Sequence, residues 1–305
     1  MTTLCELSQD DRLHRLRGDG LPLQVGPYTY RIRSNLRVVA QGIDLLYQDF
    51  PVASPKQFID FDITVSHRGV WQRLRKRSEF LFEEQSPFDS LPAHQAFAFL
   101  EWGMNWCVSL YTNEHLKLHA AVVAKDRRAI VMPGIPGAGK STLCAALGLS
   151  GWRILSDEHA LVPLGSFDVI PLCRPVSLKN ESIQVIQQRA PNATFGPLSK
   201  ETHKGLVAHL KADLQPDSHN TSALPISTLV FPRFSEEAEQ HLSPRPRSSS
   251  FLIAAYHAFN YSLLGKRGFQ AMRDLIDNVE CYDLVYHNLD WAIEQIDSLH
   301  KDKPA

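Results

Sequence analysis

Alternating hydrophobic and polar residues indicate short strands near the start of the chain. Residues 30–33 and 58–63 alternate in this way, and turn-rich segments such as residues 51–55 separate them. A longer apolar stretch follows at residues 96–111, where large apolar side chains recur at helical spacing. We therefore expect a smaller, mostly β or α+β N-terminal domain over residues 1–112, closed by a helix.

A different pattern begins near residue 113. Residues 116–124 and 129–132 predict two strands joined by a tight polar turn at residues 125–128, and the second strand leads directly into a glycine-rich segment. A helix over residues 141–149 and a strand over residues 152–155 follow. Strands at 228–234 and 282–286, helices beginning near residues 248 and 268, and a final helix over 289–299 complete the pattern. This alternation predicts an α/β domain over residues 113–305, with a mixed sheet and flanking helices.

One long segment of that second domain lacks a clear period. Residues 187–225 are rich in Pro, Ser, His and Lys. Loops of this length in a compact domain are commonly functional. We expect a mobile loop here that acts as an active-site lid or substrate loop.

The glycine-rich segment matches the phosphate-binding pattern GxxxxGK[ST]. Because it joins a strand to a helix, its backbone N–H groups and the helix dipole are expected to point at a phosphate. Lys140 is expected to neutralise phosphate oxygens, and the Ser141 hydroxyl to bind Mg²⁺. The predicted ATP-binding residues are Gly134, Ile135, Pro136, Gly137, Ala138, Gly139, Lys140, Ser141 and Thr142.

Two acidic residues, Asp157 and Glu158, follow the next predicted strand. This position brings two carboxylates toward the γ-phosphate and its metal ion. One of them can bind Mg²⁺, and the other can accept a proton from an incoming hydroxyl, as transfer of a phosphoryl group to an alcohol requires. The pair therefore favours a kinase over a simple ATPase, with a solvated acidic pair at a strand end as the structural alternative.

Several basic or imidazole side chains are further candidates. His119 lies on the strand that precedes the polar turn, where a structural histidine is the ordinary role and catalysis the alternative. Arg174, Lys179 and Lys204 are candidate phosphate clamps, although each residue type at such a position is more often an ordinary surface cation.

Composition excludes some classes of protein. The 305 residues carry 32 Lys and Arg against 33 Asp and Glu, so the net charge of -1 gives no reason to expect nucleic acid or a membrane as partner. The 5 cysteines are scattered and form no CxxC pair, and the N-terminus lacks the basic and apolar pattern of a secretory signal. A cytoplasmic protein is expected. A local basic run at residues 73–77 is either a solvated face or a docking patch for an acidic partner.

Several segments together resemble the HPr kinase/phosphorylase superfamily, and in particular its HPr-kinase-related kinase A group. The likeness is carried by His119 and the strand around it, the glycine-rich loop, and the segment 151–158 that ends in the acidic pair. It extends to residues 46–51, 101–106, 177–182 and 259–261. The resemblance implies a P-loop kinase domain of the HPr-kinase type, with Asp157 as base, Glu158 as Mg²⁺ ligand and a functional role for His119.

The chain departs from the superfamily pattern at two points. HPr-dedicated members of the superfamily carry Asp-Asp where this chain has Asp157 and Glu158, and their glycine-rich signature after the pair is missing. HPr is therefore not the implied acceptor, and a phosphorylase reaction is not implied. The related group implies a peptide or protein acceptor and a small PqqD-like peptide-binding protein as partner. An oligomer is compatible with the sequence.

These observations lead to one leading hypothesis and two alternatives. The leading hypothesis is an ATP- and Mg²⁺-dependent kinase that transfers the γ-phosphate to a serine hydroxyl of a peptide or protein, with Asp157, Lys140, His119 and Arg174 as its catalytic side chains. The first alternative is a kinase for a small-molecule alcohol. The second is a nucleotide-gated binding module in which ATP orders the loop at 187–225 without phosphoryl transfer.

Overall fold

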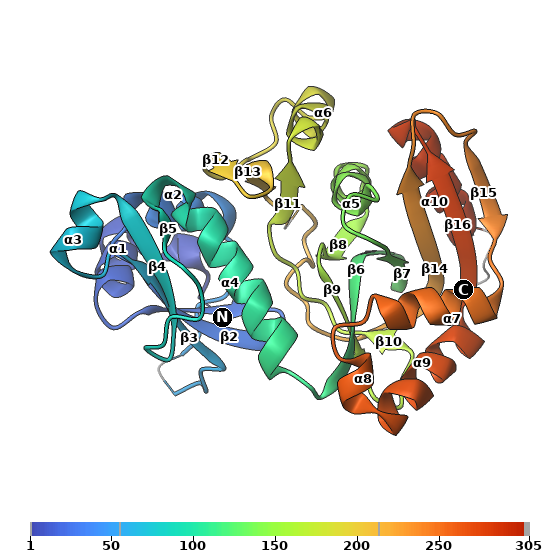
Figure 1. Cartoon of the computed structure of the whole chain (residues 1–305), viewed down its shortest axis with the longest axis horizontal. Coiled ribbons are helices and arrows are strands. Elements are labelled where there is room, and N and C mark those ends of the chain that lie inside the picture. Colours follow the sequence, from blue (N-terminus) through green and yellow to red (C-terminus); the bar gives the residue numbers. More distant parts are fainter. Residues whose placement is uncertain (1, 55, 213, 302–305) are drawn as a thin grey trace. The chain divides into compact units, whose positions relative to one another are not determined.

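The structure is a computed structural model that describes residues 2–54, 56–212 and 214–301 (Figure 1). The described chain is a mixed α/β protein and divides into two compact units. The first contains Met1–Val108 and Ser177–Lys211, and the second contains Ser109–Val176 and Ala212–Ala305. No helix within the described ranges has the length and apolar character needed to span a bilayer.

The first unit is built on a sheet with the strand order β1-β2-β3-β4-β5. Its strands are β1 (Leu21–Val25), β2 (Tyr28–Arg33), β3 (Phe61–Ser66), β4 (Arg77–Phe82) and β5 (Leu91–Pro92). Neighbours are antiparallel except for β2 and β3, which are parallel and are connected through α2 (Arg37–Leu46). The alternation of β3, with Phe61, Ile63 and Val65 buried, is the period expected of a half-buried strand.

Helices make the first unit α+β. They are α1 (Gln9–Arg17), α2, α3 (Gly69–Leu74), the start of α4 (Ala96–Tyr111) and α6 (Glu181–Arg189), with short 3-10 turns at Leu4–Glu6 and Ala93–Gln95. Helix α4 confirms the helix predicted over residues 96–111. It packs tightly, because a Cβ added to Gly103 would lie 1.8 Å from the Phe80 ring. Such contact leaves no room for a larger side chain on that face.

Part of the segment predicted to be a structureless loop is ordered in the first unit. Within residues 187–225 lie β12 (Ser199–Thr202) and β13 (Gly205–Leu210), which form a small sheet with β11 (Val176–Lys179) in the order β11-β13-β12. The part of the segment up to Lys211 belongs to the first unit, and the part from Ala212 belongs to the second. The reason is packing at long range: Lys211 pairs with Asp49, and a Cβ on Gly196 would lie 2.7 Å from Leu46. The chain passes from the first unit to the second after Val108, close to residues 112 and 113, where the sequence predicts a domain boundary.

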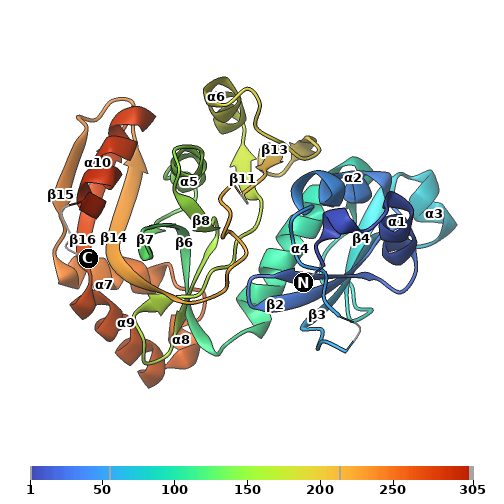
Figure 2. The same cartoon turned by 180° about the vertical axis from the view of Figure 1, so that it is seen from behind.

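The second unit contains a larger mixed sheet (Figure 2). Its main order is β15-β16-β14-β7-β6-β8, with β9 also paired to β6 and β10 to β14. The strands are β6 (His115–Lys125), β7 (Arg128–Pro133), β8 (Arg153–Ser156), β9 (His159–Pro163), β10 (Asp168–Val169), β14 (Leu224–Phe234), β15 (His241–Pro244) and β16 (Glu280–Tyr286). The strands β7, β14 and β16 run parallel, whereas β6 is antiparallel to β7, β8 and β9.

The predicted turn between β6 and β7 is a tight hairpin. Asp126 and Arg127 both have positive φ, 45° and 61°, as the two central residues of a type I′ turn require. The right-handed twist of that turn matches the twist of the strands it joins. The pairing of Ala120 with Pro133 at the far end of the hairpin then fixes where β7 leaves the sheet.

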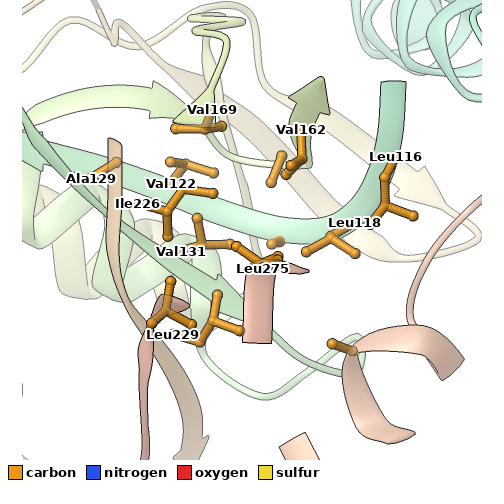
Figure 3. Packing of buried hydrophobic residues seen from close by; sticks show 14 of the residues in the cluster. Leu116, Leu118, Val122, Ala129, Val131, Val162, Val169, Ile226, Leu229 and Leu275 are labelled. Atoms are coloured by element: carbon orange, nitrogen blue, oxygen red, sulfur yellow. The ribbon is translucent and has the colours of Figure 1, made fainter. Parts of the chain in front are cut away.

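Helices cover both faces of this sheet. One face packs against α7 (Arg247–Tyr256), α8 (Tyr261–Leu264) and α9 (Lys266–Asn278), and the other against α5 (Lys140–Leu149) and α10 (Leu289–Lys301). Figure 3 shows Leu118 of β6 beside Leu275 of α9, and Leu116 and Val122 of β6 belong to the same buried cluster. Because side chains alternate along a strand, the odd-numbered residues of β6 point to the opposite face, toward α5. His119 is one of these residues.

Candidate active site

The glycine-rich loop joins β7 to α5 directly, as the sequence predicts (Figure 1). Gly137 and Gly139 have positive φ, 88° and 89°, a backbone conformation that residues with a Cβ adopt only at a cost. Helix α5 has no side-chain cap at Gly139 and no acidic residue in its first turn. Its N-terminus therefore keeps its partial positive charge available for an anion.

The loop is held in place by the ends of two neighbouring strands. The N–H of Phe234, at the end of β14, donates to the carbonyl of Ala138 at 3.1 Å. The hydroxyl of Tyr286, at the end of β16, donates to the carbonyl of Gly139 at 3.1 Å. A Cβ on Gly139 would lie 2.4 Å from that hydroxyl oxygen. Burial raises the pKa of Tyr286, which keeps the phenol protonated as a donor.

Lys140 is buried and folds back over the loop. Its ammonium donates to the carbonyl oxygens of Gly134 at 2.6 Å and Ile135 at 2.9 Å. These contacts place a positive charge directly at the N-terminal end of α5. Ser141 and Thr142 follow in the first turn of that helix. The loop and helix end thus gather backbone donors and one ammonium group at a single point.

The acidic pair directly follows the end of β8, as the sequence predicts, and lies in a break between two strands at one edge of the sheet. Strands β8 and β9 both pair with β6, and Asp157 and Glu158 occupy the interruption between them. The hydroxyl oxygen of Ser156 accepts hydrogen bonds from the N–H groups of Glu158 at 3.3 Å and His159 at 3.0 Å. The Ser156 hydroxyl oxygen thus takes the place of the backbone carbonyl oxygens that would accept these hydrogen bonds in a continuous strand. Such a substitution is expected where a strand bulges.

Strand β6 brings the loop and the acidic pair together. On one side Ala120 pairs with Pro133, the last residue of β7, and on the other its N–H donates to the carbonyl of Glu158 at 3.2 Å. Adjacent strands lie about 4.8 Å apart. The start of the loop and the acidic pair are therefore separated by little more than the width of β6.

His119 precedes Ala120 in β6 and contacts Glu158 of the acidic pair. Its Nε2 atom lies 3.3 Å from Oε1 of Glu158. Its N–H donates to the carbonyl of His257 at 2.9 Å, because residues 257–259 occupy the side of β6 that β7 leaves free. The pKa of His257 is lowered by burial and by the charges of His119 and Lys140. Those charges place both residues near His257.

A buried histidine lies beside this group. His159 pairs with His119 across β6 and β9, and its ring lies 4.8 Å from that of Phe259. A hydrogen bond of 2.8 Å joins its Nε2 atom to the Ser109 hydroxyl. Burial lowers the pKa of His159 to about 3, so the ring is neutral at physiological pH. It therefore acts as a neutral packing and hydrogen-bonding group behind the acidic pair.

Asp157 and Arg174 are both buried, with 6% and 5% of their surface exposed. The Asp157 carboxylate contributes, after burial, to the raised pKa of Cys144 on α5. Asp157 therefore lies close to the helix that the glycine-rich loop opens. Arg174 follows a segment that hydrogen-bonds to β8, and its charge contributes to lowering the pKa of His159. A buried carboxylate and a buried guanidinium thus lie around the same break.

The side-chain oxygen atoms at this site fit a Mg²⁺ ion that is held mainly by nucleotide phosphates. Magnesium prefers oxygen ligands and is usually bound through one or two carboxylates, a hydroxyl and substrate phosphates. Ser141 and Glu158 supply such oxygen atoms. The described residues contain no group of three His, Cys, Asp or Glu side chains arranged around a metal.

Two predicted phosphate clamps are in a different unit of the chain from the glycine-rich loop. Lys179 is the last residue of β11 and Lys204 precedes β13, so both belong to the first unit. The ammonium of Lys204 lies 5.7 Å from the centre of the Trp102 ring, a cation–π contact. The second unit by itself contains the loop, the acidic pair, His119 and Arg174, but neither of these lysines.

Sequence reasoning missed four residues that shape the site: Ser156, His159, Phe234 and Tyr286. Each acts through a partner that is distant in the sequence or through a bulge, so no local pattern marks it. The one available signal was Ser156, because a serine immediately before an acidic pair is a common local hydrogen-bond acceptor for the backbone.

The fold is that of a mixed α/β protein in which a glycine-rich loop joins a strand to a helix. No family model matches the chain, and no curated protein matches it. Among solved structures it is similar to the HPr(Ser) kinase/phosphatase from Coxiella burnetii, with 13% sequence identity and a TM-score of 0.29. That alignment covers 61% of this chain and 95% of the other.

Proposed function

We propose that this protein is an ATP-dependent kinase that transfers the γ-phosphate to a serine hydroxyl of a peptide or protein. The observation that carries the proposal is the acidic pair in the β8–β9 break, separated from the glycine-rich loop only by β6. A phosphate-binding loop alone serves many reactions. A buried carboxylate beside it adds a base for an alcohol acceptor, which phosphoryl transfer to serine requires.

Each side chain has a proposed role. The loop amides, the N-terminus of α5 and Lys140 bind the phosphates and stabilise negative charge that develops during transfer. To reach a phosphate, the Lys140 ammonium exchanges its bonds with the carbonyls of Gly134 and Ile135 for phosphate oxygens. Arg174 adds a second positive charge near the break.

The proton of the acceptor hydroxyl goes to Asp157. Asp157 is buried, and its carboxylate is the group proposed to accept that proton. Ser141 and Glu158 would hold Mg²⁺, which neutralises phosphate charge when bound. His119 orients the Glu158 carboxylate through their 3.3 Å contact. These roles also fit the superfamily resemblance noted from the sequence.

The test is transfer of label from γ-labelled ATP and Mg²⁺ to a library of serine-containing peptides, read by mass spectrometry. We expect phosphoserine with the wild-type protein and its loss in Asp157→Asn. Asp168→Asn, on the short strand β10 of the same unit, is the matched control and should keep activity. Label on small alcohols but on no peptide would overturn the peptide acceptor. Nucleotide binding with no transfer to any acceptor would overturn the kinase and favour the nucleotide-gated binding module.

A further inference from the structure

Helix α3 of the first unit exposes an unusual apolar surface. The exposed fractions of Val70, Trp71 and Leu74 are 72%, 76% and 70%, and no residue of the helix is buried. Their spacing of three and four residues places Leu74 beside both of the others on one helix face. Figures 1 and 2 show α3 at the margin of the first unit, next to β4. Three large apolar side chains on one short helix are a costly surface in water.

The same segment is strongly basic. Residues 67–77 contain five Lys or Arg residues and no Asp or Glu. Arg68 pairs with Glu79 at 3.7 Å, and Arg77 donates from Nε to the Ser90 hydroxyl at 3.0 Å. In the described ranges the other three, Arg73, Arg75 and Lys76, are exposed and form no ion pair. We call Val70, Trp71, Leu74, Arg73, Arg75 and Lys76 the α3 patch.

The patch is anchored from behind. Gln72, on the other side of the helix, accepts from the Arg68 N–H at 2.9 Å and donates to the Glu79 carboxylate on β4. These bonds fix the helix to the sheet while the apolar side chains point away. The side chains of Val70, Trp71 and Leu74 are therefore held facing away from β4.

The shape of the patch distinguishes between partners. A protein partner needs about 800 Å² of complementary surface on each side, usually with a pocket for its main anchors. A cleft of about 470 Å³ in this unit lies between α1 and α2 and is lined by residues such as Leu13 and Ala40. No residue of α3 lines this cleft. A lipid surface needs no matching pocket, because it receives protruding side chains one at a time.

We propose that the α3 patch docks the protein on an anionic lipid surface. Trp71, Val70 and Leu74 insert among the headgroups and upper acyl chains, where tryptophan is favoured. Arg73, Arg75 and Lys76 face the negative headgroups, and each contributes about fivefold in affinity near such a surface. The net charge of the whole chain does not reveal this patch. The chain as a whole has 32 basic and 33 acidic residues, but the local run has no carboxylate. The inference does not depend on the proposed kinase activity.

The test is co-sedimentation of the full chain with vesicles of phosphatidylcholine alone or with about one third phosphatidylserine, without nucleotide. We expect binding only to the anionic vesicles. The triple variant Arg73→Gln, Arg75→Gln, Lys76→Gln should weaken binding about hundredfold. The double variant Trp71→Ala, Leu74→Ala keeps every charge and should weaken binding tenfold or more.

Matched controls remove the same groups elsewhere. Arg17→Gln, Arg37→Gln, Lys56→Gln removes three exposed positive charges from the same unit, and Leu252→Ala, Leu263→Ala removes two exposed apolar side chains from the second unit. Both controls should bind vesicles like the wild type. Absence of wild-type binding to anionic vesicles overturns the proposal, as does equal loss in the charge control. Binding of an acidic peptide such as polyglutamate through the patch, without vesicle binding, would assign the patch to a protein partner instead.

Discussion

At the scale of single residues, the site depends on two backbone positions whose positive φ favours glycine. Gly137 and Gly139 have nearly the same positive φ, yet their surroundings differ. Nothing lies within 4 Å of a Cβ on Gly137, whereas a Cβ on Gly139 meets the Tyr286 hydroxyl at 2.4 Å. Substitutions at the two glycines therefore distinguish the energetic cost of backbone strain from that of a steric clash.

This contrast gives a first prediction. Gly137→Ala should cost about 1–2 kcal/mol through strain alone. Gly139→Ala should cost clearly more, because it also displaces Tyr286 and the end of β16 from the loop. Chemical unfolding and ATP binding by calorimetry measure both effects. Equal losses of stability in the two variants would contradict the described packing around Gly139.

A second prediction concerns pH and His159. The pKa of its ring is about 3 in the folded protein and 6.5 in the unfolded chain, so between these values only the unfolded state binds the proton. Stability contributed by the neutral ring is therefore lost as the pH falls below 6.5. Lowering the pH from 7 to 5 should remove about 2 kcal/mol of the free energy of unfolding through this residue.

The measurement is urea unfolding at both pH values in the wild type and in His159→Gln, which retains a side chain able to bond to Ser109. The variant should lose about 2 kcal/mol less than the wild type over this interval. An identical pH dependence in the two proteins would show that His159 is not held neutral.

At the scale of elements, the break between β8 and β9 is the feature that positions the acidic pair. Ser156 supplies the acceptor for two N–H groups there. Ser156→Ala should destabilise the protein by about 1–3 kcal/mol, because it leaves buried donors without this partner. It should also lower turnover more than ATP affinity, since it displaces the carboxylates and leaves the loop intact.

Ser150→Ala is the control, because the Ser150 hydroxyl donates only to the Ala146 carbonyl at the end of α5. The comparison is made by steady-state kinetics and nucleotide titration. If Ser156→Ala weakens ATP binding and turnover equally, the break does not position the pair independently of the loop.

Much of this element-scale arrangement could be predicted from sequence. The loop, its flanking strand and helix, and the acidic pair are all local in the chain, and their patterns identify them. The interruption between β8 and β9 was not predictable, because a bulge is defined by the register against β6. The anchor at Tyr286 was missed for a similar reason: it lies 147 residues from Gly139 in sequence.

At the scale of the whole molecule, the two units have separate cores. The segment Ser177–Lys211 joins the first unit through contacts such as the edge-on packing of His209 against Phe97. Such long-range contacts leave no periodic signal in the segment itself, which explains why the sequence predicted only a loop there. The separate core of the second unit implies that defects in the first unit need not disturb the loop.

Tyr47 tests this independence. Its buried hydroxyl donates to the Glu101 carboxylate at 2.6 Å, whereas the Tyr30 hydroxyl donates to a neutral carbonyl at 3.3 Å. Tyr47→Phe should cost about 1.5–3 kcal/mol and Tyr30→Phe about 1 kcal/mol, since bonds to charged groups are stronger. Both variants should bind ATP with unchanged affinity at 25 °C. Weaker ATP binding by folded Tyr47→Phe would show that the units are energetically coupled.

The central claim is that Asp157 is the base for phosphoryl transfer. Nucleotide binding at the same site does not depend on Asp157. The most direct measurement is the single-turnover rate of transfer from ATP to a responsive serine peptide, together with the ATP dissociation constant, in the wild type and Asp157→Asn. The account predicts a rate lowered about 100- to 10,000-fold with the dissociation constant within about threefold. A rate in Asp157→Asn equal to that of the wild type would contradict it.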